Sequence, residues 1–351
     1  MRKLSRREFL HLAAAGTGGL LLEQLLAGCG LQPLLPASTP SAALPGLSPT
    51  DTPAEGYPAD PSPTAGQPDP EATATQTPLP VPDLVVVRGG EPEQLVRRAL
   101  ASFGGMQAFV PAGARVVVKP NICNAYNSYE YASTTNPWVV GSLVRMCLEA
   151  GAASVTVFDY PFGGTAENAY QRSGIREQVE AAGGRMEVMN SLKFIPVSIP
   201  NALVLNNTNA YKDALEADVL INVPIAKQHG STLLTLGMKN LMGLVQNRNT
   251  LHAIGLGRSI ADLASLFRPE LTVMDAVRIL TANGPTGGDL ADVYKLDTLI
   301  VSPDIVAVDS FTTGLFGLAP GDIEYIRQAA SAGLGRSDLE NLRIEEVDLN
   351  A

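Results

Sequence analysis

The sequence predicts an α/β fold in which a mostly parallel sheet is flanked by helices on both faces, a doubly wound, three-layer arrangement. Segments with strand and helix character alternate along residues 83–347, which is the pattern of such folds. Several strand segments are continuous β-branched runs, such as Val116–Val118. Runs of this kind are typical of strands that are covered by helices on both sides. We therefore expect one α/β domain over residues 83–347.

The expected elements follow from the apolar patterns and from the turn residues between them. The predicted strands are Leu84–Val87, Arg115–Val118, Val155–Phe158, Val219–Val223, Leu271–Met274 and Thr298–Val301. The predicted helices are Glu91–Phe103, Pro137–Ala150, Ala166–Ala182, Arg258–Leu266, Ile305–Phe316 and Asp322–Ala332. Thr135 or Asn136 is expected to cap the second helix, which begins with Pro137 and ends at Gly151. A small β insertion is expected near residues 185–209, over Met186–Met189 and Ala202–Leu205.

The amino-terminal segment predicts export. Ser5–Leu10 resembles a twin-arginine signal, and Leu26–Cys29 resembles the box at which a bacterial lipoprotein is cleaved and lipidated. Residues 1–28 would then be removed, and lipid on Cys29 would hold the protein on the outer face of the bacterial cytoplasmic membrane, on the periplasmic or extracellular side. The alternative is a short membrane anchor or buried helix over Leu10–Ala27. Glu23 and several glycines in that run are unfavourable for a spanning helix.

Residues 29–82 predict a disordered linker. From Gly30 to Pro82 the chain contains 14 of its 26 prolines and no lysine or arginine. A segment of this composition buries too little apolar surface to offset the entropy of ordering it. The alternative is an ordered lid, which the lack of periodicity disfavours.

The charge and the cysteine count limit the partners. The formal net charge is −10, which argues against nucleic acid, because phosphate neutralisation needs a basic face. A small anionic ligand needs only a few local cations, so the net charge does not exclude a ligand of this kind. With Cys29 assigned to lipid, Cys123 and Cys147 remain, so no iron–sulfur cluster is expected on this chain. Cys147 fits the apolar face of a helix, and a disulfide between the two is the less favoured alternative.

Polar residues follow several of the predicted strands. Ligands of open α/β sheets bind beyond the carboxyl ends of the strands. The residues expected to converge there are Lys119, Asp159, Lys227, His229 and Asp275. Asn121, which follows Lys119 by two residues, is a further candidate ligand-binding residue, as are Lys119 and Asp159. The aspartates also suit a simpler role as caps or turn formers.

The densest polar segment is Lys227–Gly243. Its candidate ligand-binding residues are Lys227, Thr235, Lys239 and Asn240, which would suit a carboxylate or a phosphate. His229 and His252 are candidate catalytic residues for acid–base chemistry. Asp275 is a third candidate catalytic residue, which would orient a histidine or a metal ion. The sequence does not identify the metal. The alternative for the segment is a tight packing of helix and loop without a ligand. The alternative for the two histidines is a purely structural role. The glycines match neither the P-loop nor the dinucleotide fingerprint.

These motifs together resemble the DUF362 family, a domain of uncharacterised function. The matching residues are Val116–Asn121, Thr134-Thr135, Lys227-x-His229, Thr235-x-x-x-Lys239-Asn240-x-x-Gly243, His252, Asp275, Gly284-Pro285 and Asp304-x-x-Ala307-x-Asp309. Thr134 joins the candidate ligand-binding residues through this resemblance. Many relatives carry a ferredoxin-like cysteine cluster, which this chain lacks, and that puts electron transfer by this polypeptide in doubt.

Three hypotheses about function remain open from the sequence. The first is an exported enzyme in which Lys119, Lys227 and Lys239 hold a small anion and a histidine moves a proton. The second is a non-catalytic lipoprotein that binds a ligand or cofactor for a membrane-bound partner protein. The third is a metal-dependent racemase or isomerase.

Overall fold

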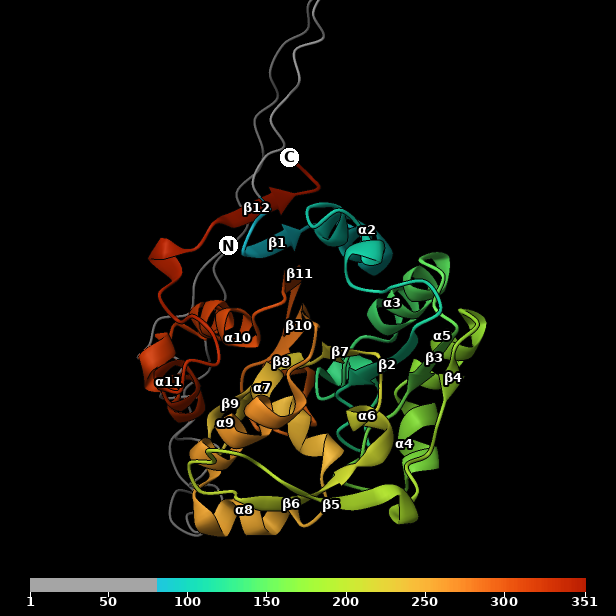
Figure 1. The fold of residues 1–351 in the computed structure, drawn as a ribbon. Helices are drawn as coiled ribbons and strands as arrows, with labels where there is room; N and C mark the ends of the chain where they lie inside the picture. Colours follow the sequence, from blue (N-terminus) through green and yellow to red (C-terminus); the bar gives the residue numbers. More distant parts are fainter. Residues whose placement is uncertain (1–80) are drawn as a thin grey trace, which may run out of the picture. The chain divides into compact units, whose positions relative to one another are not determined.

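The computed structural model describes residues 81–351, which belong to one compact unit. In that part of the chain, a ten-stranded sheet has the order β12-β1-β11-β10-β7-β2-β3-β4, and β8 and β9 extend it from β10 (Figure 1). The strands are β1 (Leu84–Arg88), β2 (Arg115–Pro120), β3 (Ser154–Val157), β4 (Arg185–Met186), β7 (Val219–Val223), β8 (Ile225–His229), β9 (Leu233–Thr235), β10 (Leu271–Leu280), β11 (Val293–Ser302) and β12 (Ile344–Asp348).

Most neighbouring strands are parallel, as predicted. β2 pairs in parallel with β3 and β7, β10 pairs in parallel with β7 and β8, and β3 pairs in parallel with β4. β11 and β9 are the exceptions in this sheet. β11 runs antiparallel to both β1 and β10, and β9 runs antiparallel to β8. β7 is buried along its whole length, which is why four of the five residues in Val219–Val223 are apolar and the fifth, Asn222, is hydrogen-bonded inside the protein.

Helices cover both faces of the sheet. They are α2 (Pro92–Ala101), α3 (Pro137–Glu149), α4 (Ala166–Arg172), α5 (Ile175–Ala181), α6 (Lys212–Leu215), α7 (Gly237–Asn240), α8 (Arg248–Ile254), α9 (Leu256–Phe267), α10 (Ile305–Thr313) and α11 (Glu324–Ser331). The period-2 alternation of a strand sends Val85 and Val87 into one apolar core and Leu84 and Val86 into another. The fold is therefore three-layered, as expected.

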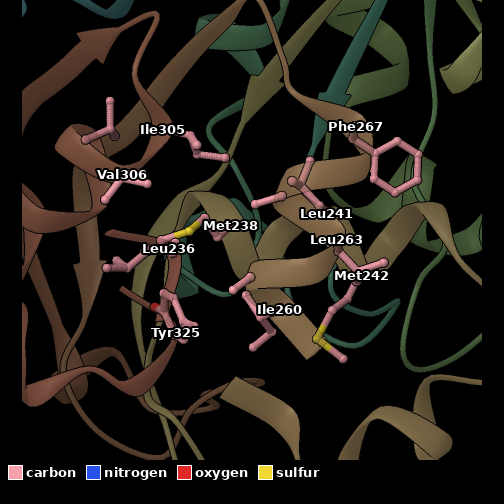
Figure 2. Close-up of a cluster of buried hydrophobic side chains, with 14 of the residues drawn as sticks. Leu236, Met238, Leu241, Met242, Ile260, Leu263, Phe267, Ile305, Val306 and Tyr325 are labelled. Carbon is pink, nitrogen blue, oxygen red and sulfur yellow. The ribbon is translucent and has the colours of Figure 1, made fainter. Parts of the chain in front are cut away.

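Each core has its own set of helices. The first contains apolar side chains of α2, α3 and α5. The second contains those of α7, α9, α10 and α11, and Figure 2 shows its centre, where Met238 and Leu241 lie among Ile260, Leu263 and Ile305. This second core supports α7, the short helix that carries two of the candidate ligand-binding residues.

The start of α3 confirms one local prediction. Asn136 is the cap, and its side-chain oxygen accepts a hydrogen bond of 3.0 Å from the backbone N–H of Trp138, while Pro137 occupies the first turn. After Glu149 the helix stops, and Gly151 adopts φ 92°. That left-handed conformation favours glycine and explains why the helix ends there.

Several predicted boundaries were wrong. The helix expected over Ala166–Ala182 is two helices, α4 and α5, because Gly174 between them has φ 75°. The strand expected to end at Met274 continues to Leu280. The predicted insertion exists as a two-stranded antiparallel sheet of β5 (Phe194–Ser198) and β6 (Asn207–Tyr211). Ala202–Leu205 is part of the connection between those strands, whereas Met186 belongs to β4 of the large sheet.

The predicted export signal, the lipidation site Cys29 and nearly all of the predicted linker lie outside the described residues. Between Val81 and Ala351, none of the helices has the length and the apolar character that crossing a bilayer requires.

Candidate functional site

A cavity of about 760 Å³ is lined by residues at or beyond the carboxyl ends of β2 and β3 and by residues of β8, β9, α7 and α8. Most of the candidate site residues line it. The lining residues that the sequence predicted are Lys119, Asn121, Asp159, Lys227, His229, Thr235, Lys239, Asn240 and His252. They come from segments more than 130 residues apart in the chain, and the fold brings them to one cavity.

Lys119 and Asp159 form an ion pair at the floor of the cavity. The distance from Lys119 Nζ to Asp159 Oδ1 is 2.8 Å, and the two side chains are 1% and 4% exposed. Lys119 Nζ also donates to the side-chain oxygen of Asn240 at 2.7 Å, and Asp159 Oδ2 accepts from the backbone N–H of Ile122 at 2.6 Å. Burial lowers the pKa of Lys119, and the Asp159 carboxylate opposes that shift. Both charges are satisfied within the protein, so this pair organises the site.

Gly243 covers the ion pair. A Cβ atom at this position would overlap Asp159 Oδ1 and would lie 2.7 Å from Lys119 Nζ. Only a residue without a side chain lets the backbone pass so close to the two charges. This contact gives a physical reason for the glycine in the Lys239-Asn240-x-x-Gly243 motif.

A network of amides links the strands. Asn121 donates from Nδ2 to Oδ1 of Asn240 at 2.9 Å and accepts from Lys227 Nζ at 3.0 Å. Asn240 in turn donates to the side-chain oxygen of Asn222 at 2.9 Å. Lys227 is 1% exposed and donates also to the backbone oxygens of Ser133 and Pro285. All three acceptors of Lys227 are neutral, so its positive charge is hydrogen-bonded but not neutralised.

Asp309 holds the start of α7. Its two carboxylate oxygens accept hydrogen bonds from the backbone N–H groups of Gly237 at 2.6 Å and Met238 at 2.9 Å. Burial raises the pKa of Asp309 to about 8. A carboxyl group at this place fixes the turn from β9 into α7, and that turn presents Lys239 and Asn240 to the cavity.

Lys239 is the least restrained of the three lysines. In residues 81–351 its ammonium group has neither a hydrogen bond nor an ion pair, and it is partly exposed to the cavity. Burial lowers the pKa of Lys239 to about 7, and the positive charges of Lys227 and Arg248 act in the same direction. At neutral pH a large fraction of this amine is uncharged.

The two histidines both line the cavity, from different elements. His229 is on β8, and its Nδ1 accepts a hydrogen bond of 3.0 Å from the backbone N–H of Ser231. The neutral ring therefore carries its proton on Nε2. Burial, with Lys239 and Lys227 nearby, lowers the pKa of His229 to about 3. His252 is an exposed residue of α8, and burial and then Lys239 lower its pKa.

Thr235 lines the same cavity with an unsatisfied hydroxyl group. Its residue is 4% exposed, and Oγ1 has no hydrogen-bond partner among the described atoms. A buried hydroxyl without a partner costs free energy. A polar ligand in the cavity would supply that partner.

Two candidates do not line the cavity, contrary to our expectation. Asp275 lies inside β10, because that strand continues beyond Met274, and its carboxylate accepts from the backbone N–H groups of Asn136 and Val277. Burial raises the pKa of Asp275 to about 6. Thr134 accepts from the backbone N–H of Cys123 at 3.3 Å. Both residues support the loop after β2 and the start of α3, which is a structural role.

Arg248 is a site residue that the sequence did not predict. Its guanidinium donates to the backbone oxygens of Tyr160 and Pro161 and lies 4.9 Å from the centre of the Tyr160 ring. Arg248 follows no strand, so the strand-end argument could not find it. Cys123 and Phe162 also line the cavity without having been predicted to do so.

The cavity carries an excess of positive charge. Among its described lining residues Asp159 has the one carboxylate, and Lys119 pairs with it. Lys227, Lys239 and Arg248 remain without an anionic partner in the described part of the chain. Across residues 81–351, no three side chains of His, Cys, Asp or Glu are grouped so that they could hold a metal ion.

Comparisons with known proteins identify a family. Residues 116–314 match the family described as "Domain of unknown function (DUF362)". The thylakoid-associated protein sll1697 of Synechocystis sp. is 28% identical over 253 residues, which are 70% of this chain and 76% of that protein.

Two solved structures are similar at low sequence identity. The lactate racemase apoprotein from Thermoanaerobacterium thermosaccharolyticum shares 13% identity with a TM-score of 0.38, over 61% of this chain and 53% of its own. A protein from Thermotoga maritima shares 11% identity with a TM-score of 0.36, over 69% of this chain and 60% of its own. This chain therefore spans little more than half of either structure.

Proposed function

The chain belongs to the DUF362 family, and we propose that its domain binds a small carboxylate or phosphate in the cavity between β2, β8 and α7. One observation carries the proposal. Lys227, Lys239 and Arg248 face the same cavity, and the carboxylate that lines it is already paired with Lys119. The positive charges of Lys227 and Arg248 disfavour the charged form of Lys239, and an anion between the three groups removes that repulsion.

Neutral donors in the cavity suit the same ligand. The unpartnered hydroxyl of Thr235 and the Nε2–H of His229 are available to oxygen atoms of a bound anion. Hydrogen bonds from such groups to a charged oxygen are stronger than those to a neutral one. The floor of the cavity, made by Lys119, Asp159 and Asn240, is fully hydrogen-bonded, so it holds its shape with or without the ligand.

Anion binding is expected to depend on pH. A bound anion favours the charged form of Lys239, whose pKa without ligand is lowered to about 7. Binding therefore takes up a proton above pH 7, and the affinity falls as the pH rises beyond that value.

The experiment measures the binding of oxalate and inorganic phosphate to residues 81–351 by calorimetry, with chloride as the reference anion. Wild-type protein is expected to bind oxalate or phosphate, with an affinity that decreases between pH 7 and pH 9. Lys227→Met and Arg248→Met are each expected to weaken binding at least tenfold. The matched control is Lys212→Met, which removes a surface cation from α6. Equal affinities in all four proteins, or no binding to the wild type, contradict the proposal.

We also propose that the protein is exported and acts at the outer face of the cytoplasmic membrane. The twin-arginine-like segment Ser5–Leu10 and the lipoprotein-like box Leu26–Cys29 support an exported domain that is tethered by lipid on Cys29. In a bacterial host, Cys29→Ser is expected to release the domain from the membrane fraction, and Arg6→Lys with Arg7→Lys is expected to keep it in the cytosol. A Cys29→Ser protein that stays with the membrane argues against the tether.

One experiment distinguishes the hypothesis that the protein only binds a ligand from the hypothesis that it is an enzyme. After native export, the purified protein is analysed for bound metals and small molecules by native mass spectrometry. A bound anion that is released unchanged supports a ligand carrier for a membrane partner. Conversion of the recovered molecule by the protein supports an enzyme.

A further inference from the structure

The three lysines of the cavity differ in how their ammonium groups are bonded. Lys119 and Lys227 are each 1% exposed and each make three polar contacts with protein oxygens. Lys239 is the one of the three for which the described residues provide no hydrogen bond or ion pair. Its amine is therefore free to approach a molecule in the cavity.

The surroundings of Lys239 favour the uncharged amine. Lys227 and Arg248 lie close enough to oppose its charge, and no carboxylate of the described residues pairs with it. A lysine that is desolvated and placed beside other cations becomes a nucleophile at neutral pH. The same cations suit a carboxylate on the molecule that the lysine attacks.

The cavity has room for such a molecule. Its volume of about 760 Å³ is in the range of small-molecule sites. Besides the cations, it offers the unpartnered hydroxyl of Thr235 and the Nε2–H of the neutral His229 ring. These neutral donors can hold the oxygen of a carbonyl group without protonating the attacking amine.

We propose that Lys239 forms an imine with the carbonyl carbon of a small oxo acid, whose carboxylate is bound by Arg248 and attracted by the positive charge of Lys227. This inference rests on the anion binding proposed above. The uncharged amine adds to the carbonyl carbon, and a new C–N bond forms as the C=O double bond opens. The former carbonyl oxygen then leaves as water with both hydrogens of the amine, so Lys239–NH₂ and O=C become Lys239–N=C and H₂O. No oxidant or reductant is consumed.

The test traps the imine by reduction. The protein is incubated with pyruvate, glyoxylate or 2-oxoglutarate, reduced with borohydride and mapped by peptide mass spectrometry. The expected result is a modified Lys239 whose mass is increased by that of the acid less one oxygen atom. The rate of trapping is expected to rise with pH up to about 7 and then to level off, following the free amine.

Variants separate the imine from the anion site. Lys239→Arg keeps a cation but has no nucleophilic amine, so the adduct is expected to disappear while the unfolding curve shows that the protein is folded. Lys212→Arg is the matched control and keeps the adduct at Lys239. If wild-type protein binds oxalate but none of the three acids modifies Lys239, the imine is wrong and the anion site stands. If neither occurs, both proposals fail. Labelling spread evenly over surface lysines also overturns the imine.

Discussion

Lys119 and Asp159 lie 2.8 Å apart at the ends of two neighbouring parallel strands, with side chains that are 1% and 4% exposed. Neither charge has access to bulk water, so each depends on the other for its stability. Removing one partner of a buried ion pair is far more costly than removing one partner of a surface pair. The pair therefore links the stability of the domain to the integrity of the cavity floor.

Asp159→Asn is expected to lower the free energy of unfolding by about 3–5 kcal/mol, because Lys119 would remain buried without an anion. Urea denaturation measures the loss. The control is Asp218→Asn, which breaks the surface pair with Arg115, where the side chains are 47% and 62% exposed. That change is expected to cost far less, because solvent screens an exposed ion pair. Similar losses in the two variants would contradict the special position of the buried pair.

Gly243→Ala is expected to destabilise the domain by about 1–3 kcal/mol, because the added methyl group overlaps the atoms of the ion pair. The comparison variant is Gly314→Ala, since a Cβ at Gly314 meets no atom within 4 Å. Gly314 also has φ −61°, which alanine adopts readily. Urea denaturation of the two variants and the wild type measures the difference. A Gly243→Ala protein as stable as Gly314→Ala would show that the backbone moves away without cost.

Lys239→Met is expected to stabilise the domain at low pH and to lose that advantage at high pH. The folded-state pKa of Lys239 is lowered to about 7 from a usual value of 10.5. Between these values the unfolded chain binds more protons than the folded one, so wild-type stability rises with pH there. The gain from Lys239→Met is therefore largest below pH 7 and vanishes by about pH 10.5. Unfolding free energies over that pH range test the sign, with Lys212→Met as the control. An increase in the unfolding free energy on Lys239→Met that becomes larger as the pH rises would contradict this prediction.

The two described cysteines are expected to react differently with iodoacetamide. Cys123 lines the cavity and is 7% exposed, whereas Cys147 is fully buried on α3 and burial raises its pKa to about 12. The native protein should be alkylated at Cys123 first, more slowly when oxalate is present, and at Cys147 after unfolding. Peptide mass spectrometry over a time course reads both rates. Faster modification of Cys147 would be inconsistent with the position of α3.

The apolar strand runs made most of the sheet predictable. A strand such as β7 is buried from end to end, so its limits can be read from the letters Val219–Val223. Lys119 and Asp159 come after runs of the same kind, which is why their meeting could be inferred. By contrast, β8 has the same length but carries Lys227 and His229 within it, so its sequence resembles a polar loop.

Other parts of the site depend on contacts that no local pattern records. Asp275 looks like a residue after a strand, yet β10 continues past it and backbone N–H groups surround its carboxylate. Arg248 reaches the cavity from α8 by bonding to the loop after β3, about ninety residues earlier in the chain. Contacts of this kind follow from tertiary packing, which overrides the local structure that a short segment of sequence favours.

The place of β1 in the sheet has a consequence for biosynthesis. Val86 lies between Ile300 of β11 and Glu346 of β12, so both neighbours of the first strand come from the last sixty or so residues. A nascent chain can therefore not pair this strand on both sides until β11 and β12 have left the ribosome. The sheet can close only after β12 has been synthesised, and a transcript truncated before codon 344 would yield a polypeptide in which one edge of the apolar strand β1 is unpaired.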